Sequence, residues 1–137
     1  MSAAKSLRAR IADRIARAKR DVFLTRDFTT LSDEDQVIRA LRRLTVDRVL
    51  LRIGKGVYAK ARVSQLSGRA VLSNPGGFQA VAEQALSRLG VQWEPTDAQQ
   101  AFAQGTSTQI PVNSVVKIKG RFARKLQYGK SELVVVR

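Results

Sequence analysis

Residues 32–60 of the chain read SDEDQVIRALRRLTVDRVLLRIGKGVYAK, and they contain a predicted helix followed directly by a predicted hairpin. Ser32 is a suitable N-cap, and the three acidic residues after it place negative charge in the first turn, where the helix dipole favours it. Apolar side chains at helical spacing predict the buried face: Val37, Ala40, Leu41 and Leu44. Polar and basic side chains fall largely on the opposite side: Gln36, Arg39, Arg42 and Arg43.

The hairpin is predicted from two apolar runs, 49–53 and 57–60, that are joined by a turn at Gly54-Lys55-Gly56. A helix that carries arginines, followed by a hairpin with a lysine at its tip, is typical of a winged helix-turn-helix domain. In such a domain the helix fits the major groove, and the hairpin reaches the flanking phosphates or the minor groove. The alternative interpretation is a solvated arginine face beside an ordinary hairpin.

The predicted DNA contacts come from both elements. Arginine can bind guanine O6 and N7, and glutamine can bind adenine N6 and N7; which arginine would read a base and which would hold a phosphate stays open. We expect Lys55 to serve the hairpin contact together with Arg52 or Lys60. The predicted DNA-binding residues are therefore Gln36, Arg39, Arg42, Arg43, Arg52, Lys55 and Lys60.

The composition also indicates a polyanionic partner. The chain of 137 residues has 25 Lys and Arg against 11 Asp and Glu, which gives a net charge of +14. Nucleic acid favours such a protein because binding releases condensed counterions. No apolar run approaches the roughly 20 residues of a spanning helix, and no signal-peptide h-region is visible, so we expect a cytoplasmic protein without membrane association.

Charge is unevenly distributed and predicts two domains. Residues 1–62 carry a net +9, residues 63–111 a net −1 and residues 112–137 a net +6. We expect an α+β protein with a winged helix-turn-helix domain at 1–62, a linker at 63–77 and a small basic α+β domain at 78–137.

The first domain is predicted to open with an arginine-rich helix over about residues 3–20, for which a solvated face and direct DNA contact are equally good interpretations. A short strand at 22–24 and a short helix over 26–31, capped by Thr25, follow it. The second domain is predicted to contain helices at 78–89 and 97–104, with Gly90 ending the first. Its predicted strands are 91–93, 112–119 and 132–136.

The last predicted feature is a secondary basic surface formed by Lys117, Lys119, Arg121, Arg124 and Lys125. Four aromatic residues could stack on bases, namely Tyr58, Trp93, Phe122 and Tyr128, although core positions are the favoured interpretation. An RNA-binding or translation-associated factor is therefore the alternative to a DNA-binding protein, and a pure interaction module is the third option.

The chain offers little for catalysis. It has no histidine and no cysteine, which removes imidazole acid–base chemistry, thiol nucleophiles, disulfides and thiolate or histidine metal ligands. The acidic residues 33–35 are better explained by the helix dipole than by catalysis. We expect no enzyme activity, no catalytic residue, no metal site and no cofactor.

Three segments carry a resemblance to a known family: FLTRDF at 23–28, VIRALRRL at 37–44 and LRIGKGVY at 51–58. Over about residues 5–62 they resemble the winged-helix region of AbiEi-like antitoxins of type IV (abortive infection) toxin–antitoxin operons, and residues 63–137 are more loosely similar. The resemblance implies an N-terminal domain that represses its own promoter. It also implies a functional link to a nucleotidyltransferase-like toxin without stable binding. We therefore expect the partner to be double-stranded DNA. This expectation allows for a homodimer on the DNA.

Overall fold

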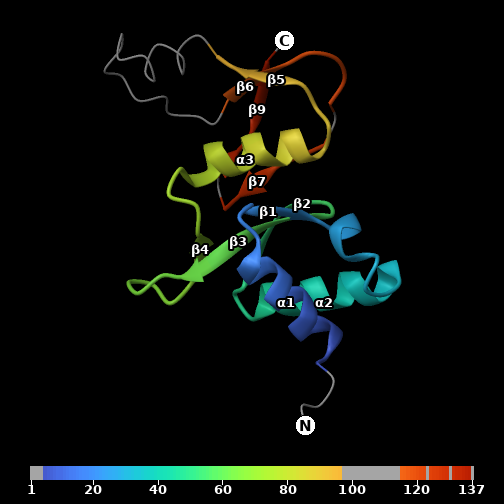
Figure 1. Ribbon diagram of the computed structural model, residues 1–137. Coiled ribbons are helices and arrows are strands. Elements are labelled where there is room, and N and C mark those ends of the chain that lie inside the picture. Colours follow the sequence, from blue (N-terminus) through green and yellow to red (C-terminus); the bar gives the residue numbers. More distant parts are fainter. Residues whose placement is uncertain (1–4, 97–114, 123, 130, 137) are drawn as a thin grey trace. The chain divides into compact units, whose positions relative to one another are not determined.

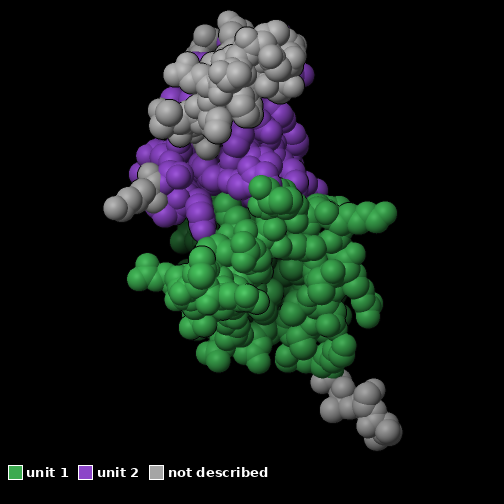
Figure 2. Space-filling model, turned by 90° about the vertical axis from the view of Figure 1, so that its left-hand side faces the viewer, with its two compact units in different colours: residues 1–75 green, residues 76–137 purple. Residues whose placement is uncertain are grey.

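The protein is a mixed α+β chain, and its computed structural model describes residues 5–96, 115–122, 124–129 and 131–136 (Figure 1). The chain divides into two compact units, residues 1–75 and residues 76–137, which are coloured separately in Figure 2. The helix predicted at 97–104 lies outside the described residues. The expected α+β class is confirmed.

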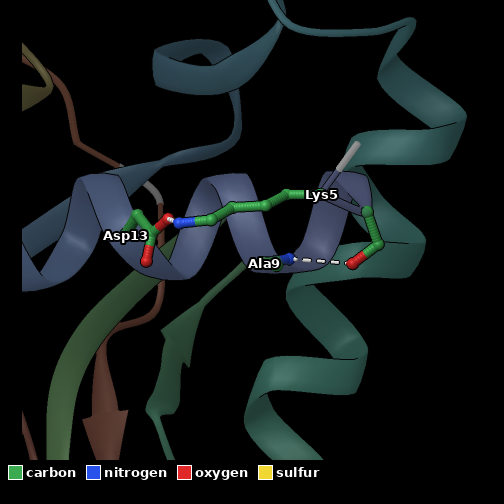
Figure 3. Close-up of polar contacts among 4 residues, drawn as sticks. Lys5, Ala9 and Asp13 are labelled. Atoms are coloured by element: carbon green, nitrogen blue, oxygen red, sulfur yellow. Dashed lines mark hydrogen bonds and ion pairs between the residues drawn. The ribbon is translucent and has the colours of Figure 1, made fainter. Parts of the chain in front are cut away.

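Unit 1, residues 1–75, begins with helix α1 (Leu7–Arg17), which is shorter than the predicted 3–20. Ser6 caps it, and its hydroxyl accepts a hydrogen bond from the main-chain nitrogen of Ala9 at 3.1 Å (Figure 3). Lys5 Nζ forms an ion pair with the Asp13 carboxylate on the same side of the helix (Figure 3). The hydrogen bond that Lys5 donates in this ion pair lowers the pKa of Asp13 below its ordinary 3.8.

Strand β1 (Val22–Leu24) confirms the predicted short strand, but the helix after it differs from the prediction. It is a 3-10 helix, η1, over Thr25–Phe28, and Leu24 rather than Thr25 occupies the N-cap position. The Asp27 carboxylate accepts a hydrogen bond from the Leu24 nitrogen at 2.8 Å. The prediction of a Thr25 cap was wrong because the helix begins one residue earlier than expected, so Thr25 is its first residue and Asp27 reaches back to the nitrogen of Leu24.

Helix α2 (Glu34–Val46) starts one residue later than predicted. Its N-cap is Asp33, whose Oδ1 accepts from the Gln36 nitrogen at 2.9 Å, so the prediction of Ser32 as cap was wrong. Aspartate and serine are equally good N-caps, and local sequence could not choose between them. The predicted buried face is confirmed, since Val37 and Leu41 are fully buried and Ala40 and Leu44 almost so. These side chains pack with Ile11 and Ile15 of α1 in the core of unit 1.

The four-stranded sheet of unit 1 has β3 (Val57–Val63) at its centre, paired antiparallel with each of the other three strands. Strand β2 (Leu50–Gly54) forms the predicted hairpin with β3, and β1 pairs with β3 through Phe23 and Tyr58. Strand β4 (Ala70–Leu72) pairs with the C-terminal end of β3. Residues 63–72, which the composition predicted as part of a linker, thus form the end of β3, a turn and β4.

Unit 2, residues 76–137, contains helix α3 (Gly77–Arg88), close to the predicted 78–89. Gly90 follows its C-cap with φ +77°, as predicted for a helix that ends in a left-handed glycine. Strand β6 (Val115–Ile118) pairs antiparallel with β5 (Trp93–Pro95) and parallel with β9 (Val134–Val136). Strand β5 starts two residues after the predicted position.

The predicted strand 132–136 is two strands in two different sheets. Strand β7 (Gln127–Tyr128) pairs with β8 (Ser131–Glu132), whereas β9 joins β6. Leu133, between β8 and β9, is buried. Its nitrogen donates to the Leu126 carbonyl oxygen at 3.0 Å, which continues the β7–β8 register by one pair before the chain joins β6 as β9.

Candidate nucleic-acid interface

A groove of about 420 Å³ lies between helix α2 and the β2–β3 hairpin of unit 1. Arg42 enters it from α2, and Arg52 and Lys55 enter it from the hairpin. Glu34, at the start of α2, supplies the single carboxylate among its lining residues. We call this the α2–hairpin groove. It brings together three of the cations that the sequence analysis assigned to DNA.

The tip of the hairpin is held against η1. Gly56 has φ +71°, a left-handed conformation that glycine adopts without strain. Its carbonyl oxygen accepts a hydrogen bond from the Thr25 nitrogen at 3.2 Å. Arg52 Nε donates to the Gly54 oxygen at 3.4 Å, across the register shift that separates Arg52 from Gly54 in β2. These hydrogen bonds therefore fix the main chain of the turn that carries Arg52 and Lys55.

The outer face of α2 carries two of the predicted arginines and one residue that the sequence analysis missed. Arg39, Arg42 and Val46 are spaced three, four and seven apart, so they share the helix face that points away from the core. All three are exposed, and Val46 is 71% exposed. Val46 could have been found from its spacing, because it is four residues after Arg42 and lies outside the buried stripe of the helix.

Arg43 and Gln36 are neighbours of Arg39 on the exposed surface of α2, four residues after it and three before it. Both are exposed, but neither they nor Arg39 line the α2–hairpin groove. Arg43 Nε lies 3.4 Å from Asp47 Oδ1, and the same aspartate lies 3.8 Å from Arg8 of α1. Of the four predicted α2 residues, Arg42 therefore lines the groove, and Arg43 is partly neutralised by a carboxylate.

Lys60 has a structural partner. Its Nζ donates to the carbonyl oxygen of Ala18 at 2.7 Å, at the C-cap of α1. A cation at this end of a helix is favoured by the helix dipole. The structure therefore separates Lys60 from the groove cations with which the sequence grouped it.

Charge is polarised along α2. Its cap and first turn carry Asp33, Glu34 and Asp35, whereas its arginines are confined to residues 39–43. Carboxylates at the N-terminus satisfy the helix dipole but repel a phosphate. Any polyanion would therefore be held by the middle and C-terminal turns of α2 together with the hairpin.

A second basic concavity, of about 370 Å³, lies where α1 ends. Arg14, Arg17 and Arg20 line it above the side chains of Phe23 and Phe28, whose ring centroids are 6.0 Å apart. From the sequence, a solvated face and direct DNA contact are equally good interpretations of these arginines.

The predicted secondary basic surface of unit 2 is also divided. Lys117 and Lys119 line a pocket beside Trp93, whereas Arg121, Arg124 and Lys125 are exposed outside that pocket's lining. Lys125 lies 4.0 Å from Glu132.

Within the described ranges, no group of three or more His, Cys, Asp or Glu side chains is arranged to hold a metal ion. Among the described helices, none combines the length and the apolar character that crossing a bilayer needs.

The fold and the groove define a two-unit α+β protein with a cationic groove on its first unit. The chain belongs to DUF6088, a family of unknown function, whose family model matches residues 10–136. Comparison with curated proteins and with solved structures gave no match.

Proposed function

We propose that unit 1 is a winged helix-turn-helix domain that binds double-stranded DNA, and that the protein is a sequence-specific, antitoxin-like repressor of its own operon. One observation carries the proposal. Arg42 of α2 and the hairpin cations Arg52 and Lys55 line the same groove, although they come from different elements. A helix and a hairpin that present cations side by side can contact a base edge and the neighbouring phosphates together.

The order of elements supports this assignment. Helix α1, strand β1, the short helix η1, helix α2 and the β2–β3 hairpin follow one another as a winged helix-turn-helix requires. Only residues 29–33 separate η1 from α2. In this arrangement α2 is the recognition helix and the β2–β3 hairpin is the wing.

The exposed face of α2 has the chemistry of direct readout. Arginine forks to guanine O6 and N7, and an apolar side chain contacts the thymine methyl group. Arg39 and Arg42 provide the former and Val46 the latter on one face. Arg52 and Lys55 then hold the flanking phosphates, which positions the helix without reading sequence.

The antitoxin role rests on the resemblance of 23–28, 37–44 and 51–58 to AbiEi-like antitoxins. In that role the protein represses the promoter of its own operon and counteracts a nucleotidyltransferase-like toxin without a stable complex. The toxin would be encoded by the adjacent reading frame.

The test is binding of the full chain to the duplex upstream of its own gene and to a shuffled duplex of equal length. If about five to eight phosphates are neutralised, the slope of log K against log salt is about −4 to −7. We expect the upstream duplex to bind more tightly than the shuffled one at moderate salt. Equal affinity for both, or a flat salt response, would contradict the proposal.

Arg42→Ala is the informative variant, with Arg69→Ala as its matched control. Both arginines are exposed, but Arg69 precedes β4 and is not among the residues that line the groove. We expect Arg42→Ala to weaken binding of the upstream duplex by about 1–3 kcal/mol. Arg69→Ala should change it by less than half as much, and equal losses would point to unspecific charge attraction.

A further inference from the structure

We infer that unit 2 contains a separate binding site for single-stranded nucleic acid, in which a base stacks on Trp93 and its phosphate lies at Lys117 and Lys119. The site is a pocket of about 430 Å³. That volume falls within the usual range for small-ligand pockets. It is formed only by residues of unit 2, so the inference does not depend on the groove of unit 1.

Trp93 provides the stacking surface. It is the only tryptophan of the chain and is partly exposed, at the start of β5. Its indole Nε1 donates to the Ser87 hydroxyl of α3 at 2.8 Å, which orients the ring. A tryptophan that is held in this way loses little conformational entropy when a base stacks on it, and stacking is tolerant of base identity.

Two lysines that line the same pocket provide its positive charge. Lys117 lies in β6 and Lys119 follows it directly, so they share one side of the strand, whereas Trp93 pairs with Ile118 and its ring reaches the pocket from the other side of the β5–β6 ladder. The Lys119 nitrogen donates to the Gln92 oxygen at 3.4 Å, which ties the end of β6 to the residue before Trp93. The cations are therefore attached to the same short ladder as the indole.

Glu94 determines how a nucleotide would lie. It stands directly opposite Lys117 in the β5–β6 register and also lines the pocket. Its carboxylate balances one lysine, so the pocket keeps a net positive charge at Lys119. A phosphate is attracted to the Lys119 side, whereas Glu94 can accept a hydrogen bond from a base amino group.

Duplex DNA cannot use this pocket in the same way, because its bases are already stacked and paired. An unpaired base exposes its π face to an aromatic side chain at no unstacking cost. The pocket therefore fits a single strand.

The experiment uses the fluorescence of Trp93 in the full chain. Oligothymidylate and oligouridylate of roughly ten nucleotides are titrated separately, with a blunt duplex of equal length as the third arm. We expect a saturable quench by the single strands and none by the duplex. Absence of a quench by both single strands would overturn the inference.

Two variants locate the site, with binding followed by anisotropy of a dye-labelled single strand. Trp93→Leu keeps an apolar side chain but removes the aromatic ring, and should weaken binding about 5- to 100-fold. Lys119→Ala should weaken binding several-fold, while Lys125→Ala, at an exposed lysine outside the pocket, should have a smaller effect. Equal losses for the two lysine variants, or unchanged binding by Trp93→Leu, would overturn the inference.

The outcome is independent of the proposed function of unit 1. Replacement of Arg42 and Lys55 together by alanine should abolish preference for the upstream duplex and leave the quench by single strands unchanged. Loss of the quench in that double variant would place single-strand binding in unit 1 and contradict the inference.

Discussion

Lys60 of β3 and Ala18 at the end of α1 are joined by a hydrogen bond from Nζ to the carbonyl oxygen at 2.7 Å, across 42 residues of sequence. The bond satisfies a carbonyl that the helix leaves unpaired and places a positive charge at the negative end of its dipole. It also attaches the first helix to the central strand of the sheet. A lysine that the sequence grouped with the DNA contacts therefore stabilises unit 1.

We expect Lys60→Met to lower the free energy of unfolding by about 1–2 kcal/mol, because a charged hydrogen bond and a favourable dipole interaction are lost. Lys55→Met is the control and should change stability by less than about 0.5 kcal/mol, since Lys55 is exposed at the turn. Urea unfolding measures the loss of stability in both variants. The DNA affinity of the folded proteins should show the reverse order, with the larger loss in Lys55→Met. If Lys60→Met weakened DNA binding and Lys55→Met did not, Lys60 would be a DNA contact after all.

The arginines of α2 should differ in their effects on sequence preference. We expect Arg39→Ala to weaken binding to the upstream duplex by about 1–3 kcal/mol and to relax sequence preference, because Arg39 lies on the outer face. Arg43→Ala should cost less, because Asp47 lies 3.4 Å from its Nε. Affinities for a set of single-base variants of the duplex measure both effects. Greater loss of preference in Arg43→Ala than in Arg39→Ala would assign the base contact to Arg43 instead.

The limits of unit 1 predict which fragment can fold. A fragment of residues 1–75 keeps β4 and the hydrogen bond from Asn74 Nδ2 to Asp21 Oδ2 at 2.8 Å. A fragment of residues 1–62 loses both, and exposes one side of the end of β3. We expect the longer fragment to unfold cooperatively and to prefer the upstream duplex, and the shorter one to be less stable in urea. Equal stability of the two fragments would show that β4 contributes nothing to the fold.

The longer fragment also tests whether the proposed promoter binding and the proposed antitoxin activity can be separated. It retains the α2–hairpin groove but lacks unit 2, so we expect it to bind the upstream duplex and to fail to rescue cells from the neighbouring toxin. Growth in the presence of the induced toxin measures rescue. Rescue as effective as that of the full chain would assign the antitoxin activity to unit 1.

Asp13 should titrate below its ordinary pKa of 3.8, because Lys5 donates a hydrogen bond to its charged form. Since the folded pKa is depressed, the stabilising effect is complete above the unfolded pKa and is lost as pH falls through the folded pKa. Carboxyl NMR titration of the wild type and Lys5→Gln measures this, and the variant should titrate closer to 3.8. An unchanged midpoint in Lys5→Gln would show that another group lowers this pKa.

Local patterns in the sequence were sufficient for the elements of unit 1 that have one apolar face. Val37, Ala40, Leu41 and Leu44 define the buried face of α2 by spacing alone, because a helix must bury its apolar stripe. The two runs around Gly54-Lys55-Gly56 predicted the hairpin for a similar reason, since only a few turns can join two adjacent strands. The choice of cap was harder, as Ser32 and Asp33 are chemically equivalent candidates and their order along the chain does not rank them.

The sequence by itself determined the α+β class, the central helix and hairpin of unit 1, and the strongly basic charge. Tertiary structure alone decided how the cations are used. Arg42 and Arg43 are adjacent in the chain, yet one lines the groove and the other pairs with Asp47, because adjacent residues on a helix point about 100° apart. Lys55 and Lys60 belong to one hairpin, yet Lys60 reaches a carbonyl of α1 because long-range packing brings that helix end beside β3. Such partners are set by contacts between elements far apart in sequence, and residue spacing within one element contains no information about them.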